Sequence, residues 1–174
     1  MSINEFIAFW NEKNVSSAEK RLASAYVAAT EQLQQIRTEL LGYLRPQRTA
    51  KGGLVAAFSD EAAPIMSRYE GIEAELAGLR TSIEEFTAIT GGPSLDALLR
   101  EKHRLRKFLE SADNEIRTCT LRAVRKGQTE ADALANKDVQ AALAKKDHIE
   151  SEFGSKLEAV EGKIKRASVI LAKH

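Results

Sequence analysis

The sequence has few of the residues that disulfides, zinc sites and tight turns require. Its 174 residues include one cysteine, Cys119, three prolines and three histidines. A single cysteine excludes an intramolecular disulfide and a zinc site built from cysteines. Because a proline breaks a helix interior, the long stretches without proline favour α-helix over a β-sandwich.

Long apolar runs are also absent. No run approaches the roughly 20 residues that a membrane-spanning helix needs, and Met1–Trp10 lacks the basic region of a signal peptide. We therefore expect a cytoplasmic protein. The formal net charge is +1, so the chain as a whole is not a polycation suited to nucleic acid or acidic lipid. Apolar residues make up 43% of the chain, which argues against disorder.

Catalytic and phosphate-binding motifs are missing as well. The sequence contains no G-x-x-x-x-G-K-[ST] phosphate loop and no G-x-S-x-G nucleophile motif. A di-iron carboxylate site needs inward-facing Glu-x-x-His pairs, but Arg100 and Lys145 stand three residues before His103 and His148. Cys119 occupies a core position of its predicted helix, where burial makes a thiol unreactive. We therefore expect no enzymatic activity, no cofactor and no bound metal.

Apolar residues at heptad spacing are what the sequence does contain. In the first long segment, seven positions alternate by four and three residues: Leu22, Tyr26, Ala29, Leu33, Ile36, Leu40 and Tyr43. The second segment repeats the spacing at Ile65, Tyr69, Ile72, Leu76, Leu79, Ile83 and Phe86. Two further segments carry similar apolar stripes. Such stripes are typical of long helices that pack side by side.

Capping and turn residues set the boundaries of these helices. Capping boxes are predicted at residues 2–5 and 16–19, and Pro46 and Gly91 mark helix ends. We predict a short helix at 2–13 and long helices at about 17–45, 60–90, 94–126 and 129–173. Residues 46–53 are expected to form a loop. The apolar residues after it are expected to pack against the start of the next helix: Leu54, Val55 and Phe58.

The predicted fold class is all-α. Short turns between successive helices make neighbours antiparallel. We expect an elongated antiparallel helical bundle or coiled coil of three to four long helices with a short N-terminal helix, in a single domain spanning residues 1–174. An extended hairpin that closes its core by dimerising fits the pattern equally well.

The N-terminal segment is the first candidate binding site, because it holds much of the aromatic content of the chain. Its apolar and aromatic residues are Phe6, Ile7, Phe9 and Trp10. They could plug the end of the bundle as core, anchor in the groove of a protein partner, or lie on a membrane surface. No lysine or arginine precedes Lys13, which argues against strong attraction to anionic lipid.

Charge is unevenly divided between two consecutive helices. Residues 60–90 hold seven acidic and two basic residues, a net −5, whereas 94–126 hold nine basic and five acidic, a net +4. We expect these helices to pack side by side so that their charges complement each other. The alternative is a stripe that binds nucleic-acid phosphates without reading sequence, formed by Arg100, Lys102, Arg104, Arg106, Lys107, Arg122, Arg125 and Lys126.

Taken together, these patterns indicate a structural or protein-interaction module without catalytic activity, such as a scaffold, adaptor or assembly protein. Its partner would be another protein, a second copy of the chain, or both, and we expect a homo-oligomer. One alternative is a membrane-surface or membrane-remodelling coiled coil that uses the N-terminal helix. The other is a nucleic-acid-binding protein that uses the basic helix at 94–126.

Overall fold

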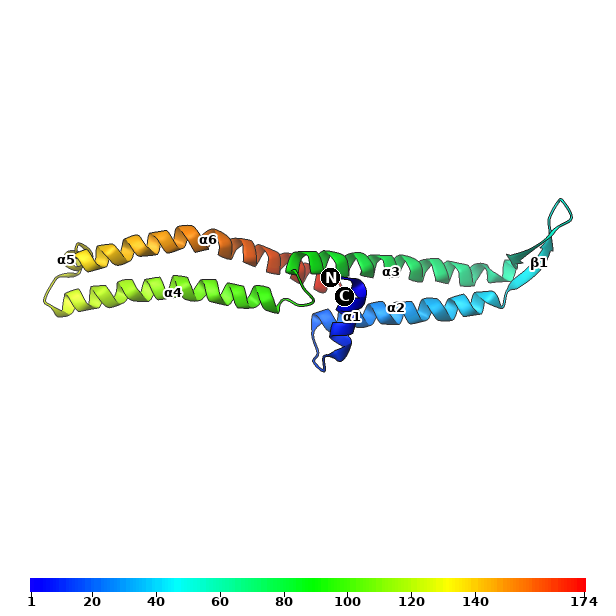
Figure 1. The fold of residues 1–174 in the computed structure, drawn as a ribbon, viewed down its shortest axis with the longest axis horizontal. Helices are drawn as coiled ribbons and strands as arrows, with labels where there is room; N and C mark the ends of the chain where they lie inside the picture. The colour runs from blue at the N-terminus through cyan, green and yellow to red at the C-terminus, as the bar shows by residue number, and fades with distance from the viewer. The chain divides into compact units, whose positions relative to one another are not determined.

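The computed structural model describes the backbone of residues 1–174 and every side chain except that of Glu130. Six α-helices make up most of the chain, together with one two-stranded sheet (Figure 1). The predicted all-α class is therefore confirmed. The chain divides into two compact units, Met1–Pro93 with Val169–His174, and Ser94–Ser168. The single domain expected from the sequence stays a prediction.

The first unit contains α1 (Ile3–Glu12), α2 (Ala18–Leu41), β1 (Leu44–Arg48), β2 (Leu54–Phe58), the 3₁₀ turn η1 (Asp60–Ala62) and α3 (Ala63–Thr90). The second unit contains α4 (Asp96–Arg125), α5 (Glu130–Leu134) and most of α6 (Lys137–Leu171). The last residues of α6 belong to the first unit.

Both helices at the N-terminus begin at serine caps. The capping box at Ser2 and Glu5 is confirmed, because the Glu5 N–H donates to the Ser2 hydroxyl and the Glu5 carboxylate accepts the Ser2 N–H. The box expected at residues 16–19 is wrong by one position, since Ser17 caps α2 and accepts the Lys20 N–H at 3.1 Å. Lysine has no carboxylate to return the bond, so Ser17 and Lys20 do not form a capping box.

The heptad seams of α2 and α3 meet in the core of the first unit. Near the sheet, Ile36 and Leu40 of α2 pack with Ala62 and Ile65, and half-buried tyrosines lie against this cluster. Near the N-terminus, α1 joins the two long helices, and the fully buried side chains there are Phe6, Leu22, Ile83 and Phe86. The seam residues of α2 and α3 in these two clusters are buried as the four-and-three spacing indicates.

A β-hairpin replaces part of the predicted first helix and the predicted loop. Helix α2 ends at Leu41 instead of near residue 45, and β1 then pairs with β2 in antiparallel register, Pro46 opposite Ala56. Gly52, with φ of +77°, supplies the left-handed turn between the strands. The expected packing against the start of the next helix is also wrong for Leu54 and Val55, which are 71% and 49% exposed on the hairpin.

The second unit is an antiparallel helical hairpin. From the N-terminal part of α4, Lys102 and Arg106 reach Glu161 late in α6. From further along α4, Asp113 reaches Lys146 near the start of α6. The partner number falls as the α4 number rises, so the two helices run in opposite directions. Ion pairs of this kind fix register more than they add stability.

The turn between α4 and α6 corrects the predicted fourth helix. Gly127, with φ of +86°, ends α4 as the sequence indicates, and Thr129 caps the short α5 through the Asp132 N–H. The helix predicted at 129–173 is nevertheless interrupted at Ala135 and Asn136. The Asn136 side chain accepts the Asp138 N–H at 2.9 Å, which starts α6 as a separate helix.

Candidate protein-interaction surfaces

The aromatic residues of α1 lie largely in the core. Phe6 is fully buried, with its ring centroid 6.0 Å from that of Phe86 in an edge-to-face arrangement. Trp10 is 6% exposed, and its indole N–H donates to the Pro93 carbonyl at 2.8 Å. Ile7 and Phe9 are half-buried. Of the roles left open by the sequence, this burial favours the core.

A docking or lipid-facing role for α1 would need the same rings at the surface. Phe9 is the accessible ring of the segment, and the Lys13 ammonium lies 4.9 Å above its centroid. A partner could therefore reach Phe9 and Ile7 without unfolding α1, whereas Phe6 and Trp10 are occupied inside the unit. Partner binding by the four residues together stays a prediction. The burial of Phe6 and Trp10 in the core disfavours it.

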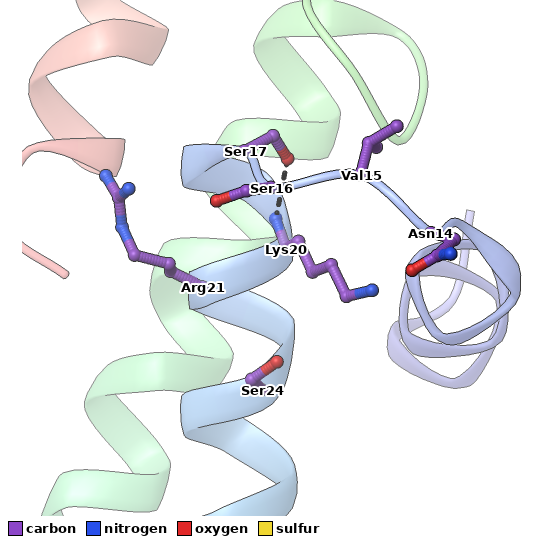
Figure 2. A pocket seen from close by; sticks show the side chains of 7 residues that line it. All are labelled: Asn14, Val15, Ser16, Ser17, Lys20, Arg21 and Ser24. Carbon is purple, nitrogen blue, oxygen red and sulfur yellow. Dashed lines mark hydrogen bonds between the residues drawn. The ribbon is translucent and has the colours of Figure 1, made fainter.

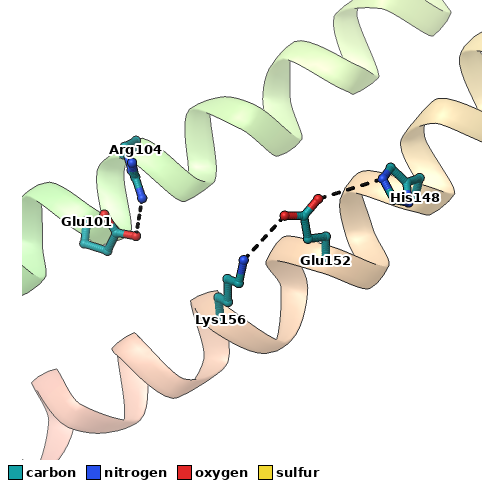
Figure 3. Close-up of polar contacts among 5 residues, drawn as sticks. All are labelled: Glu101, Arg104, His148, Glu152 and Lys156. Atoms are coloured by element: carbon teal, nitrogen blue, oxygen red, sulfur yellow. Dashed lines mark hydrogen bonds and ion pairs between the residues drawn. The ribbon is translucent and has the colours of Figure 1, made fainter.

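The basic residues of α4 fall into two groups. The first group is held in ion pairs: Arg104 with Glu101 at 2.7 Å (Figure 3), and Lys102 and Arg106 with Glu161 at 3.1 and 2.7 Å. The second group is exposed and forms no ion pair with any side chain that the structure describes. Its members are Arg100, Lys107, Arg117, Arg122, Arg125 and, just after the helix, Lys126. These six are the cations of this segment that remain available for an outside anion.

The described ion pairs of α3 and α4 lie within the unit to which each helix belongs. Arg68 of α3 lies 3.6 Å from Glu39 of α2, and the cations of α4 reach α6. The expected α3–α4 complementarity stays a prediction, because charge alone does not decide which apolar faces meet.

Glu161 is the most connected carboxylate between the two helices of the second unit. Hydrogen bonds from Lys102 and Arg106 lower the pKa of its carboxyl below the usual value. Across the same interface, hydrogen bonds to Asp113 and Glu150 raise the pKa of the Lys146 ammonium. Both shifts favour the charged forms. These residues therefore hold α4 and α6 in register and show no sign of tuning for acid–base chemistry.

The histidines do not assemble into a metal site. His148 is exposed on α6, where Glu152 lies between it and Lys156, one turn away on either side (Figure 3). His174 contacts the Ser82 hydroxyl at 3.0 Å. Among the residues that the structure describes, no cluster of histidine, cysteine, aspartate or glutamate could hold a metal ion.

A polar hollow of about 480 Å³ lies beside the start of α2. Figure 2 shows that its lining comes from the α1–α2 connection and the first turns of α2: Asn14, Val15, Ser16, Ser17, Lys20, Arg21 and Ser24. The side chains of Lys20 and Arg21 leave the helix in opposite directions (Figure 2). They do not converge on one ligand position. The hollow therefore contains two cations, but their side chains are not arranged to bind one anion together.

The core of the second unit is incomplete. On α4 the buried positions are Leu105 and two alanines, Ala112 and Ala123. The larger seam residues remain half-buried: Leu98, Leu109, Ile116, Ile149, Phe153, Leu157, Val160 and Ile164. Two helices alone cover only one side of each apolar stripe, so the wide stripes seen in the sequence are left partly open.

One side of α4 carries exposed apolar side chains, which we call the α4 flank. It consists of Leu99, Leu121 and Val124, which are 46%, 49% and 38% exposed. Separations of 22 and 25 residues are close to whole helical turns, so these three side chains share a face. Apolar residues gathered on one face of a soluble helix are typical of an interaction surface.

A second apolar surface lies where α2, α3 and the hairpin meet, and sequence reasoning missed it. A groove of about 440 Å³ is lined by Arg37, Leu40, Leu41, Phe58, Met66, Tyr69 and Glu70. Leu41, Phe58 and Met66 are 59%, 38% and 39% exposed there. The available signal was that Leu41 and Met66 fall outside the heptad seams of their helices.

Comparison of the chain with protein-family models, curated proteins and solved structures finds no match. Across the residues that the structure describes, no helix is long and apolar enough to cross a membrane.

Proposed function

We propose that the chain is a non-catalytic protein-interaction module whose α4–α6 hairpin packs against helices of a partner. The finished assembly would be an antiparallel bundle with coiled-coil packing. The observation that supports this proposal is the incomplete core of the second unit, in which leucines and isoleucines of both seams remain half-buried. A scaffold, an adaptor or an assembly protein would each present such a surface.

The energetics favour a helical partner for this surface. Burying an apolar side chain fully is worth about 1.5–3 kcal/mol, so completing the burial of a half-exposed leucine contributes about 1 kcal/mol. The α4 flank offers such increments, and the less exposed seam residues each add a smaller one. Ion pairs between α4 and α6 already fix the two helices in register. The surface is therefore pre-organised, which lowers the entropic cost of binding.

The proposal includes self-association and a cytoplasmic location. A second copy of the hairpin is one source of the missing helices, and two hairpins make a four-helix bundle. The lone Cys119 forms no disulfide within the chain, so an oxidising compartment would add nothing to its stability.

A photo-cross-linkable residue at position 121 tests the proposal in the cells that produce the protein. We expect a protein adduct from position 121, because Leu121 lies on the α4 flank. The cross-linked peptide of the partner should carry apolar residues at heptad spacing, as a helix packed in a bundle requires. Mass spectrometry of the digested adduct identifies that peptide.

Position 15 supplies the matched control for this experiment. Val15 is 55% exposed, similar to Leu121 at 49%, but it lies in the first unit, outside any apolar seam. The proposal requires an adduct at 121 that is absent at 15. Equal adducts at both positions, or none at 121, would contradict it.

Nucleic-acid binding is a second candidate, supported by the six exposed cations of residues 100–126 that form no ion pair with described side chains. By helical periodicity Arg100, Lys107 and Arg125 share one face of α4, opposite the buried Leu105. If this face binds phosphates, a Lys107→Glu and Arg125→Glu variant should lose affinity for a DNA duplex, and wild-type affinity should fall as salt rises. Binding that does not respond to salt, or no binding at low salt, would remove this candidate.

A further inference from the structure

The hydrogen bonds that flank the β-hairpin determine which backbone groups point out of it. The Ser59 N–H donates to the Tyr43 carbonyl at 3.1 Å, and the Thr49 N–H donates to the Gly53 carbonyl at 2.8 Å. Both are directly opposite pairs in the register of the hairpin. In an antiparallel ladder every second opposite pair is hydrogen-bonded. Counting opposite pairs inward from either end of the hairpin assigns the same pairs as hydrogen-bonded.

The pairs between the bonded ones direct their N–H and C=O groups away from the partner strand. On β1 these outward-facing residues are Leu44, Pro46 and Arg48, and on β2 they are Leu54, Ala56 and Phe58. The sheet has two strands, so each strand has an outer edge along which no other strand lies. The residues of these two edges differ in a way that decides which of them can accept another strand.

The outer edge of β1 is blocked. Pro46 has no N–H to offer, and Arg45 and Arg48 place charge along the strand, as protected edges in natural sheets do. The outer edge of β2 has none of these features. Its sequence is Leu-Val-Ala-Ala-Phe, with no proline, no charged residue and a donor at every position. Leu54 is also 71% exposed and Val55 49%.

We propose that the outer edge of β2 pairs in antiparallel register with β2 of a second copy of this chain, forming a four-stranded sheet across a twofold dimer. The register centres on Ala56. Leu54 then lies opposite Phe58 of the partner subunit, and Ala56 lies opposite Ala56 of the partner subunit. The three outward-facing residues of one strand meet the three of the other, so each outward donor finds an acceptor.

Self-complementarity is what identifies a second copy as the occupant. A twofold contact brings the same strand against itself, so each residue must fit the residue that the twofold axis places opposite it. Around Ala56 the strand places a large residue on each side of a small one, so that leucine faces phenylalanine and alanine faces alanine. Contact between leucine and phenylalanine buries apolar surface, and no like charges are brought together. This surface is separate from the α4 flank of the proposed function.

Substitution of Ala56 by proline tests the pairing in the purified full chain. Ala56 lies opposite Pro46, and its N–H is not used inside the hairpin, so Ala56→Pro should leave the β1–β2 ladder intact. Sedimentation analysis of the unchanged chain should show a dimer of twice 19.2 kDa. We expect Ala56→Pro to weaken dimerisation at least tenfold, whereas Ala56→Ser, which keeps the N–H, should not.

A cysteine at the same position tests the register directly. In the proposed dimer the two Ala56 Cα atoms form a hydrogen-bonded pair about 5.5 Å apart, within disulfide range. In a Cys119→Ser background, Ala56→Cys should form a disulfide-linked dimer under mild oxidation. Gln47→Cys is the matched control, because it is equally exposed but lies on the other strand. It should remain unlinked.

The outcomes separate this proposal from the proposed function. A monomer at every concentration, or a disulfide at position 47 equal to that at 56, would overturn β2 pairing. A dimer that survives Ala56→Pro but is lost on Leu121→Asp would also overturn it, and would instead support self-association through the α4–α6 hairpin. We expect the dimer to be lost in Ala56→Pro and retained in Leu121→Asp.

Discussion

Replacing Phe86 with alanine is expected to destabilise the first unit by about 3–5 kcal/mol. Phe86 is fully buried at the point where α1 meets the long helices, and its ring packs edge-to-face against Phe6. The substitution removes the ring and leaves a cavity that the surrounding helices fill only in part. Urea unfolding of the full chain, followed by circular dichroism, measures the change in the free energy of unfolding.

Phe108→Ala is the matched control for this prediction. Phe108 also stacks on another ring, that of Phe153, but it is 45% exposed, so we expect a loss of less than about 2 kcal/mol. A double-mutant cycle between Phe6 and Phe86 should give a coupling of about 0.5–1.5 kcal/mol. A loss below about 1 kcal/mol for Phe86→Ala would show that α1 is not held in the core. The docking role of α1 would then become the stronger interpretation.

The long helices of this fold could be predicted because each repeats one local rule many times. Six successive seam positions in α2 and seven in α3 follow the four-and-three spacing, and a helix brings residues at this spacing onto one side. Leu22, Ile36, Ile83 and Phe86 are buried as this rule requires. Where the rule breaks, at Gly91 and Gly127, the structure places left-handed glycines that end helices.

The hairpin could not be predicted in the same way. Five-residue strands are too short for a period to be measured, and an apolar run such as 54–58 is compatible with a helix or a strand. The signal that was available is the position of the glycines, since Gly52 and Gly53 lie between two segments of equal length. In the sequence, Pro46 predicts the end of a helix. It also fits a strand edge, because an outward-facing position needs no N–H.

The candidate binding residues show a limit of a different kind. Periodicity places Phe6 and Trp10 on one face of α1, but it cannot say what covers that face. Phe6 is covered by Phe86, and the Trp10 N–H is satisfied by Pro93, both far away in sequence. The same limit applies to α4, where the sequence lists the cations but not their partners. Only the structure separates Arg106, which is paired with Glu161, from Lys107, which is exposed.

Replacing Leu105 with alanine should destabilise the second unit by about 2–5 kcal/mol. Among the described side chains of α4, Leu105 is the one large residue that is fully buried, at 1% exposed. The neighbouring seam residues are half-buried and compensate little for the cavity. Hydrogen exchange measured by mass spectrometry should show faster exchange of amides throughout α4 and in α6 up to Ser168.

The same experiment tests the domain organisation. Because the two compact units have separate cores, we expect amides of α2 and α3 to keep their protection in Leu105→Ala. Leu98→Ala, at a half-buried position of the same seam, is the control and should have a smaller effect. Equal loss of protection in α2 and α3 would instead show that the chain unfolds as the single domain expected from its sequence. A bound helical partner should restore the protection of α4 in Leu105→Ala, because new contacts on the half-buried seams add stability that the isolated hairpin lacks.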